Sequence, residues 1–130
     1  MDPSIDPSKR AAPAPPTHDG QVTLINSFVV EPSRDDEFVG LWTETSRYFR
    51  EQPGFVALRF HRALRPGATY RYVNVATWES LEQFQAAHAT QRFRDLVGQS
   101  GWSEFPSSPA LYDVIVDHTA QTAEPHLASI

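Results

Sequence analysis

The sequence predicts an α+β fold with the ferredoxin-like split βαβ topology: a four-stranded antiparallel sheet with helices on one face. Two observations lead to this prediction. Apolar runs typical of strands and segments of helical periodicity follow one another in the order strand, helix, strand, strand, helix, strand. The chain of 130 residues, less its polar ends, also has about the size of one common domain. One core and one sheet are therefore expected.

Both ends of the chain differ in composition from its middle. Residues 1–20 are rich in Pro, Ala, Ser and Asp, and residues 118–130 are mostly polar. Such segments bury too little apolar surface to offset the entropy lost on ordering. We therefore expect a disordered N-terminal extension over residues 1–20, a folded domain over residues 21–117 and a flexible C-terminal tail over residues 118–130.

The composition excludes several classes of function. The net charge is −5 and the basic residues are spread along the chain, which argues against a nucleic-acid or anionic-membrane partner. Cysteine is absent, so there is no disulfide, thiolate nucleophile or cysteine-based metal site. No apolar run reaches about 18 residues and the N-terminus lacks a signal pattern, so a soluble cytoplasmic protein is expected.

The first strand is predicted over residues 22–31. The first helix should begin at about residue 36. Ser33, followed three residues later by Asp36, has the pattern of a helix N-cap. The helix then places one apolar face at helical spacing: Phe38, Leu41, Trp42, Thr45 and Phe49. Pro53 and Gly54 should end it after about five turns.

The middle of the sequence predicts a hairpin followed by a second helix. Residues 55–64 alternate as a strand, and the turn at residues 65–68 should pair them with residues 70–78. Ser80 and Gln83 have the spacing of a capping box, which begins a helix whose inward face carries Phe84 and His88.

The last part of the sequence has weaker patterns. A break near residues 89–90 leads to a short helix that carries Phe93, Leu96 and Val97. A loop over residues 98–109 follows, and the last strand is predicted over residues 111–117.

The third strand contains a polar residue that its pattern does not explain. Alternation places Asn74 on one face with Tyr72 and Trp78, and burying a carboxamide without partners costs about 1–3 kcal/mol. The first strand carries Asn26 in the same kind of position. If the first and third strands are central parallel neighbours, as this topology suggests, Asn26 and Asn74 share a face with Trp78.

The opposite face of these strands is too apolar for contact with water. Ile25 and Val29 lie there with Val73 and Val75, and the predicted helices cover the other side. A second sheet should therefore cover this face, which predicts a homodimer.

Three segments resemble the antibiotic biosynthesis monooxygenase family: residues 22–30, the junction of residues 52–55, and Tyr72-Val73-Asn74-x-Ala76-x-Trp78 with Phe84 and His88 downstream. The resemblance implies a dimeric α+β barrel. The greatest likeness is to the cofactor-independent anthrone oxygenases of aromatic polyketide pathways, which use the positions of Asn26, Asn74 and Trp78.

The resemblance also bears on cofactors. Haem-degrading relatives carry a His and a Trp where this sequence has Val97 and Ala87, so haem is not expected. No two histidines have helical metal-ligand spacing, and no metal is expected either. Molecular oxygen would be a co-substrate and no cofactor would be needed.

Oxygenation without a cofactor requires a substrate that supplies its own electrons as an enolate. Neutral donors in an apolar cavity stabilise such an oxyanion, a role that suits Asn26, Asn74 and Trp78 as catalytic residues. Alternatively, both asparagines bridge neighbouring strands or cap a buried backbone group. His88 is either catalytic or a core residue. The expected substrate-binding residues are Phe28, Trp42, Phe60, Tyr72, Phe84, His88 and Phe93.

The sequence thus predicts a cofactor-free monooxygenase that oxidises an anthrone-type, polycyclic aromatic polyketide intermediate to a quinone. Two alternatives remain on the same fold. One is a non-oxidative polyketide cyclase or lyase, which would depend on an acid–base group such as His88. The other is a non-catalytic ligand-binding accessory protein.

Overall fold

The computed structural model describes residues 18–98 and 101–120. Most of both predicted terminal segments, residues 1–17 and 121–130, lies outside the described residues, and the predicted domain bounds stay a prediction. The elements follow the predicted order, and the α+β prediction is confirmed. No helix in the described part of the chain is long and apolar enough to cross a membrane.

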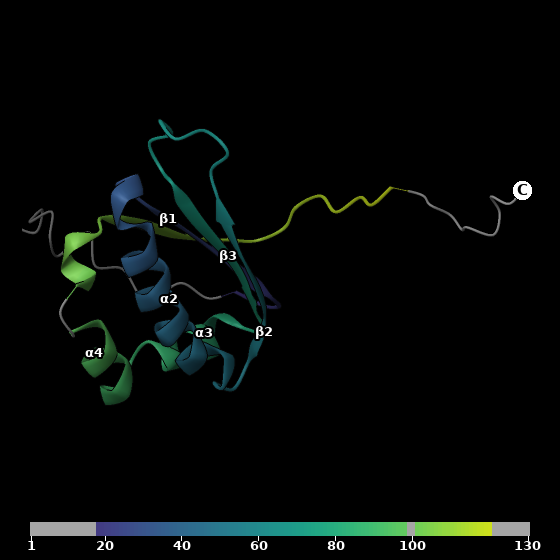
Figure 1. Ribbon diagram of the computed structural model, residues 1–130. Helices are drawn as coiled ribbons and strands as arrows, with labels where there is room; N and C mark the ends of the chain where they lie inside the picture. The colour runs from purple at the N-terminus through teal and green to yellow at the C-terminus, as the bar shows by residue number, and fades with distance from the viewer. Residues whose placement is uncertain (1–17, 99–100, 121–130) are drawn as a thin grey trace, which may run out of the picture.

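The sheet has four antiparallel strands in the order β2-β3-β1-β4, with the helices packed on one face (Figure 1). The strands are β1 (Val22–Phe28), β2 (Phe55–Arg62), β3 (Tyr72–Trp78) and β4 (Ser107–Tyr112). The expectation that the first and third strands are parallel is wrong. The helical crossover makes β1 and β2 parallel, and the hairpin then reverses the chain, so β3 must run antiparallel to β1.

The last strand lies earlier in the chain than predicted. We expected it over residues 111–117, but β4 spans Ser107–Tyr112 and includes Pro109. A proline is tolerated because β4 is an edge strand, paired only with β1. The apolar side chains of Val114, Ile115 and Val116 lie beyond the sheet and are exposed.

The first helix begins differently from the prediction. Pro32–Arg34 form a 3-10 turn, η2, and the helix α2 spans Asp35–Arg50. Ser33 is therefore part of the turn and caps nothing, because proline starts helical geometry one residue earlier. The residue before α2 is Arg34, whose side chain makes no capping bond to the helix backbone.

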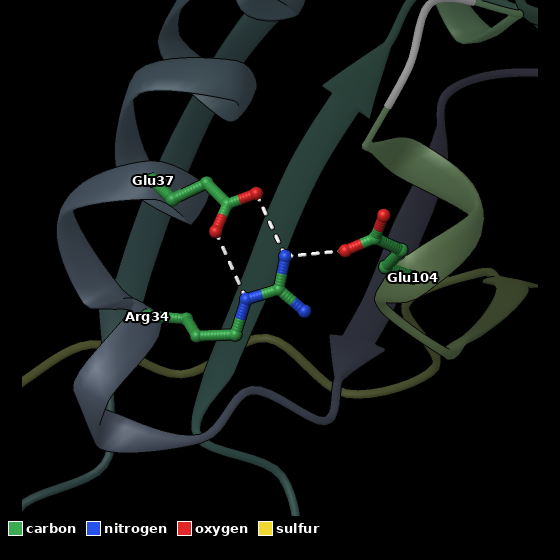
Figure 2. Close-up of polar contacts among 3 residues, drawn as sticks. All are labelled: Arg34, Glu37 and Glu104. Carbon is green, nitrogen blue, oxygen red and sulfur yellow. Dashed lines mark hydrogen bonds and ion pairs between the residues drawn. The ribbon is translucent and has the colours of Figure 1, made fainter.

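Arg34 instead joins α2 to a second 3-10 turn, η3 (Trp102–Glu104). Its Nε and Nη2 donate to Glu37 at 2.9 and 2.7 Å, and Nη2 also donates to Glu104 at 2.5 Å (Figure 2). The guanidinium lies over the Phe105 ring, 4.5 Å from its centroid. The segment before β4 is thereby held against the start of α2.

Two short helices follow β3: α3 (Leu81–Ala87), with Ser80 as its N-cap, and α4 (Gln91–Val97), with Thr90 as its N-cap. Ser80 Oγ accepts from the Gln83 backbone N–H at 3.1 Å, which confirms the predicted N-cap. Gly54, in the turn before β2, has φ +89° and an added Cβ there would lie 2.5 Å from the Gln83 side chain. Only glycine fits between this turn and α3.

The core between sheet and helices divides into two clusters of side chains. The Trp78 cluster contains Val22, Ala76, Trp78, Leu81 and Ala87, with Leu24, Phe49, Phe55, Leu58 and Phe84 packed against it. The Phe38 cluster contains Phe28, Val30, Phe38, Tyr72 and Phe105, with Leu41, Trp42, Phe60 and Trp102 packed against it. The two clusters lie at opposite ends of β1 and β3.

Candidate functional site

A cavity of about 310 Å³ lies between the sheet and the helices. This volume is at the lower end of the roughly 300–1,000 Å³ of small-molecule sites. Its wall is mostly apolar and aromatic: Leu24, Asn26, Phe28, Trp42, Thr45, Ser46, Phe49, Phe55, Leu58, Asn74, Ala76, Trp78, Phe84, His88, Phe93, Val97, Trp102, Ser107 and Pro109. The site can therefore hold a flat apolar molecule.

The sheet places two asparagines side by side in this wall. Asn26 of β1 pairs directly with Asn74 of β3. Trp78 lies four residues after Asn74 in β3, and the alternation of the strand places both on the same face. Asn74 and Trp78 are buried, and Asn26 is half-buried. All three predicted catalytic residues thus come together in one cavity.

Three polar atoms of this trio have no hydrogen-bond partner within the described part of the chain. They are Oδ1 of Asn26, Oδ1 of Asn74 and Nε1 of Trp78, and each is buried. Most buried polar side-chain atoms in proteins are paired, and an unpaired one costs about 1–3 kcal/mol. A half-turn of either carboxamide would present its NH₂ group in place of the oxygen.

The alternative in which the two carboxamides bridge the strands gains no support from this geometry. Their oxygen atoms lie on directly paired residues, yet neither accepts a hydrogen bond from a described residue. A fourth unpaired atom, the Tyr72 hydroxyl oxygen, lies in the Phe38 cluster and away from the cavity wall.

His88 follows α3 and lies in an aromatic part of the cavity wall. Its ring packs against Phe84 at 4.1 Å, Phe49 at 4.8 Å and Phe93 at 4.9 Å between centroids. Burial lowers the pKa of His88, although a hydrogen bond with the Phe84 carbonyl opposes that effect. The imidazole is therefore neutral at pH 7.

Among the described residues, the wall has one ionisable group. Apart from His88, it contains no Asp, Glu, Lys, Arg or Tyr side chain. No group of three His, Cys, Asp or Glu side chains that could hold a metal ion occurs within residues 18–98 and 101–120. The wall offers carboxamides, an indole N–H, hydroxyls and one imidazole.

Five of the seven predicted substrate-binding residues line the cavity: Phe28, Trp42, Phe84, His88 and Phe93. Phe60 and Tyr72 do not. Phe60 stacks on Trp42 at 3.8 Å and on Tyr72 at 5.2 Å, so it packs behind the wall within the Phe38 cluster. Phe60 and Tyr72 lie on the predicted face of the sheet, but their rings pack within the Phe38 cluster and do not line the cavity.

Several other wall residues were not predicted to belong to the site. Thr45 accepts a hydrogen bond from Trp102 Nε1 at 3.0 Å and donates to the Leu41 carbonyl at 3.1 Å. This contact closes one side of the cavity. The helical spacing of Trp42, Thr45 and Phe49 could have identified the α2 residues, whereas Trp102 comes from a segment without periodicity.

Comparison with known proteins identifies relatives of this chain. Tetracenomycin-F1 monooxygenase from Streptomyces glaucescens is 38% identical over 73 residues, which make up 55% of this chain and 62% of that protein. Deoxynogalonate monooxygenase from Streptomyces nogalater is 35% identical over 74 residues, or 56% of this chain and 59% of that protein. The chain thus spans about three fifths of the length of these curated relatives.

A solved structure and a family match extend the comparison. SnoaB, a cofactor-independent oxygenase from Streptomyces nogalater, has a TM-score of 0.64 at 25% sequence identity, covering 79% of this chain and 98% of that chain. Residues 21–99 match the family described as antibiotic biosynthesis monooxygenase. The chain therefore belongs to the antibiotic biosynthesis monooxygenase family.

Proposed function

We propose that this protein is a cofactor-independent monooxygenase that oxidises an anthrone-type, polycyclic aromatic polyketide intermediate to a quinone with molecular oxygen. The observation that carries the proposal is the set of unpaired polar atoms of Asn26, Asn74 and Trp78 in one apolar cavity. The named relatives, two polyketide monooxygenases and a cofactor-independent oxygenase, support the same class of reaction.

The chemistry follows from what such a wall can stabilise. An anthrone that loses a proton becomes an electron-rich enolate, which can pass an electron to dioxygen without a flavin or a metal. The carboxamide NH₂ groups of Asn26 and Asn74 would donate to the enolate oxygen, and the Trp78 indole would add an N–H and a flat wall. The aromatic wall would exclude water from the peroxide that forms.

Two other functions fit the same fold. A cyclase or lyase would use His88 for acid–base chemistry and would be indifferent to oxygen. A ligand-binding accessory protein would hold the same aromatic molecule without turning it over. Neither function explains why three unpaired polar atoms, two carboxamide oxygens and one indole N–H, should lie together in an apolar cavity.

The test is an assay with a simple anthrone and chelator-treated protein, in air and under argon. We expect quinone to form faster than the spontaneous rate in air, with one molecule of oxygen consumed for each quinone, and not under argon. Equal conversion with and without oxygen would favour the cyclase or lyase. Binding without conversion would favour the accessory protein.

We also propose that the protein acts as a homodimer through the outer face of the sheet. Ile25 of β1 pairs with Val75 of β3 on that face, and the helices pack on the other (Figure 1). A second copy would cover the same residues on both subunits, with an interface above about 1,000 Å². Light scattering at micromolar concentration should give twice the mass of one chain, and a folded monomer would contradict the proposal.

A further inference from the structure

Among the residues that the structure describes, one side chain of the cavity wall can take up a proton near neutral pH. His88 is the sole ionisable group among the residues that form the wall. The four aromatic rings that contact it, from β3, α2, α3 and α4, belong to Trp78, Phe49, Phe84 and Phe93, none of which titrates near neutral pH. A substrate that must lose a proton inside this cavity therefore has one protein group to receive it.

The orientation of the His88 ring is fixed by one hydrogen bond. Nδ1 lies 2.8 Å from the Phe84 carbonyl oxygen, an acceptor, so Nδ1 carries the hydrogen and donates. The neutral ring then has its lone pair on Nε2. No described residue forms a hydrogen bond with Nε2, so this nitrogen is free to accept a proton.

We propose that His88 Nε2 is the catalytic base that removes the proton from the substrate carbon and returns it to the peroxide. This inference rests on the proposed function, because it names the proton acceptor of that reaction. It gives His88 direct contact with the reacting atoms, whereas Asn26, Asn74 and Trp78 hold the developing oxyanion.

The proton transfers balance over the whole reaction. Nε2 takes one proton from the CH₂ group, leaving an enolate and an imidazolium. The enolate reduces dioxygen and forms a C–O bond, and the imidazolium protonates the resulting peroxide anion. His88 then removes the second proton from the same carbon, the O–O bond breaks, and hydroxide leaves as water after taking that proton. The CH₂ group and O₂ become C=O and H₂O.

The surroundings of His88 suit a base that cycles in this way. Because burial lowers its pKa, the ring is deprotonated and ready to accept at pH 7. When it is charged, the Phe49 ring stacked on it at an interplanar angle of 29° can stabilise the cation. The Phe84 carbonyl stabilises the same charged form through Nδ1.

The test separates proton removal from oxygenation. Anthrone is incubated in D₂O under argon, and exchange of its methylene hydrogens for deuterium is followed by NMR. The wild-type protein should accelerate exchange over the buffer rate, and His88→Gln should lower this acceleration by about 10²- to 10⁴-fold, the usual contribution of a general base. Added imidazole should restore part of the exchange in His88→Gln.

Two further variants keep the test decisive. His18→Gln is the matched control, since the ring of His18 also contacts a backbone carbonyl, that of Gln21 at 3.1 Å, but lies outside the cavity wall. His88→Phe, which fits the aromatic surroundings, replaces His88→Gln if the latter does not fold. His18→Gln should exchange at the wild-type rate.

Each outcome decides one of the two claims. Wild-type exchange in either folded His88 variant would overturn the His88 inference, even if quinone still forms in air. A wild-type protein that does not accelerate exchange would overturn it as well. Exchange that depends on His88, without quinone formation in air, would support His88 as the base and remove the monooxygenase proposal.

Discussion

The two clusters of the core use the same kinds of residue in opposite ways. In the Phe38 cluster, aromatic rings fill the space: Phe38 is fully buried, and its ring centroid lies 5.0 Å from those of Phe28, Tyr72 and Phe105. In the Trp78 cluster, rings pack edge-on around Trp78, but its indole N–H stays unpaired beside the cavity. Most residues of the Trp78 cluster line the cavity, whereas the Phe38 cluster is largely filled by its own rings and reaches the cavity only through Phe28, Trp42 and Trp102.

The difference shows that aromatic content alone does not identify a binding site. Both clusters contain Phe and Trp or Tyr, and both lie on the same face of the same two strands. The binding site is distinguished by the paired Asn26 and Asn74, which lie between the two clusters. The aromatic rings around them provide no hydrogen-bond partner for their carboxamide oxygens. Substitutions should therefore affect stability at one end and turnover at the other.

The largest effect should follow from Phe38→Ala. Removing a fully buried ring that packs against rings on every side should lower the free energy of unfolding by about 3–5 kcal/mol. Phe84→Ala makes the same change at the cavity, where the ring is half-buried, and should cost about 1–2 kcal/mol while reducing turnover. Urea unfolding of both variants measures the contrast, and equal losses would contradict it.

The next effect concerns turnover rather than stability, and we expect it from Asn74→Ala and Trp78→Phe. If their side chains hold the enolate, anthrone turnover should fall about 10- to 1,000-fold while the protein stays folded. Asn26→Ala combined with Asn74→Ala should be non-additive if both amides hold one oxygen.

The structural alternative for the asparagines makes the opposite prediction. If they stabilise only the fold, each alanine change should lower stability by about 1–3 kcal/mol, and residual activity should follow the folded fraction. Turnover and thermal unfolding measured on the same variants decide between the two. Full activity in a stable Asn74→Ala protein would end the oxyanion proposal.

The smallest expected effect is on the pH dependence of stability, and it arises from the ion pair between Asp35 and Arg71. Arg71 donates to both carboxylate oxygens of Asp35 at 2.7 Å and, as the main cause, lowers the pKa of Asp35 to about 2. Because the folded-state pKa is depressed, this stabilisation is present above pH 3.8 and is lost as the pH falls toward 2.

Asp35→Asn should therefore lower the melting temperature at pH 5 and reduce its dependence on pH between 4 and 2. Thermal unfolding at several pH values measures both effects. Glu44→Gln, which breaks an exposed pair with Arg47 at 3.4 Å, is the matched control and should behave like the wild type. An unchanged pH dependence in Asp35→Asn would show that other carboxyl groups determine acid unfolding.

Much of the fold could be predicted because its periodic signals are local. Alternation along β3 placed Tyr72, Asn74 and Trp78 on one face, and all three are buried there. The capping pattern at Ser80 located the start of α3 for the same reason. The shared face of Asn26 and Asn74 followed from the topology, whereas their direct pairing and the antiparallel direction of their strands were not predicted.

The features that could not be predicted depend on contacts between distant segments. Pro109 suggests a loop unless its strand is known to lie at the edge of the sheet. Trp102 reaches the cavity because it bonds to Thr45 and because Arg34 holds η3 against α2. Phe60 shares a face with Asn74, but only the register shows which end of the core it fills.

The glycine in the turn before β2 has a consequence for directed evolution of this protein. At Gly54 even alanine would meet the Gln83 side chain and would also need an unfavourable backbone conformation. A saturation library at this position should yield glycine almost exclusively among folded clones. A smaller residue at position 83 would not relieve the collision, because every residue except glycine keeps the Cβ that lies 2.5 Å away, and the backbone strain would remain in any case. This turn therefore constrains the sequences accessible to the fold.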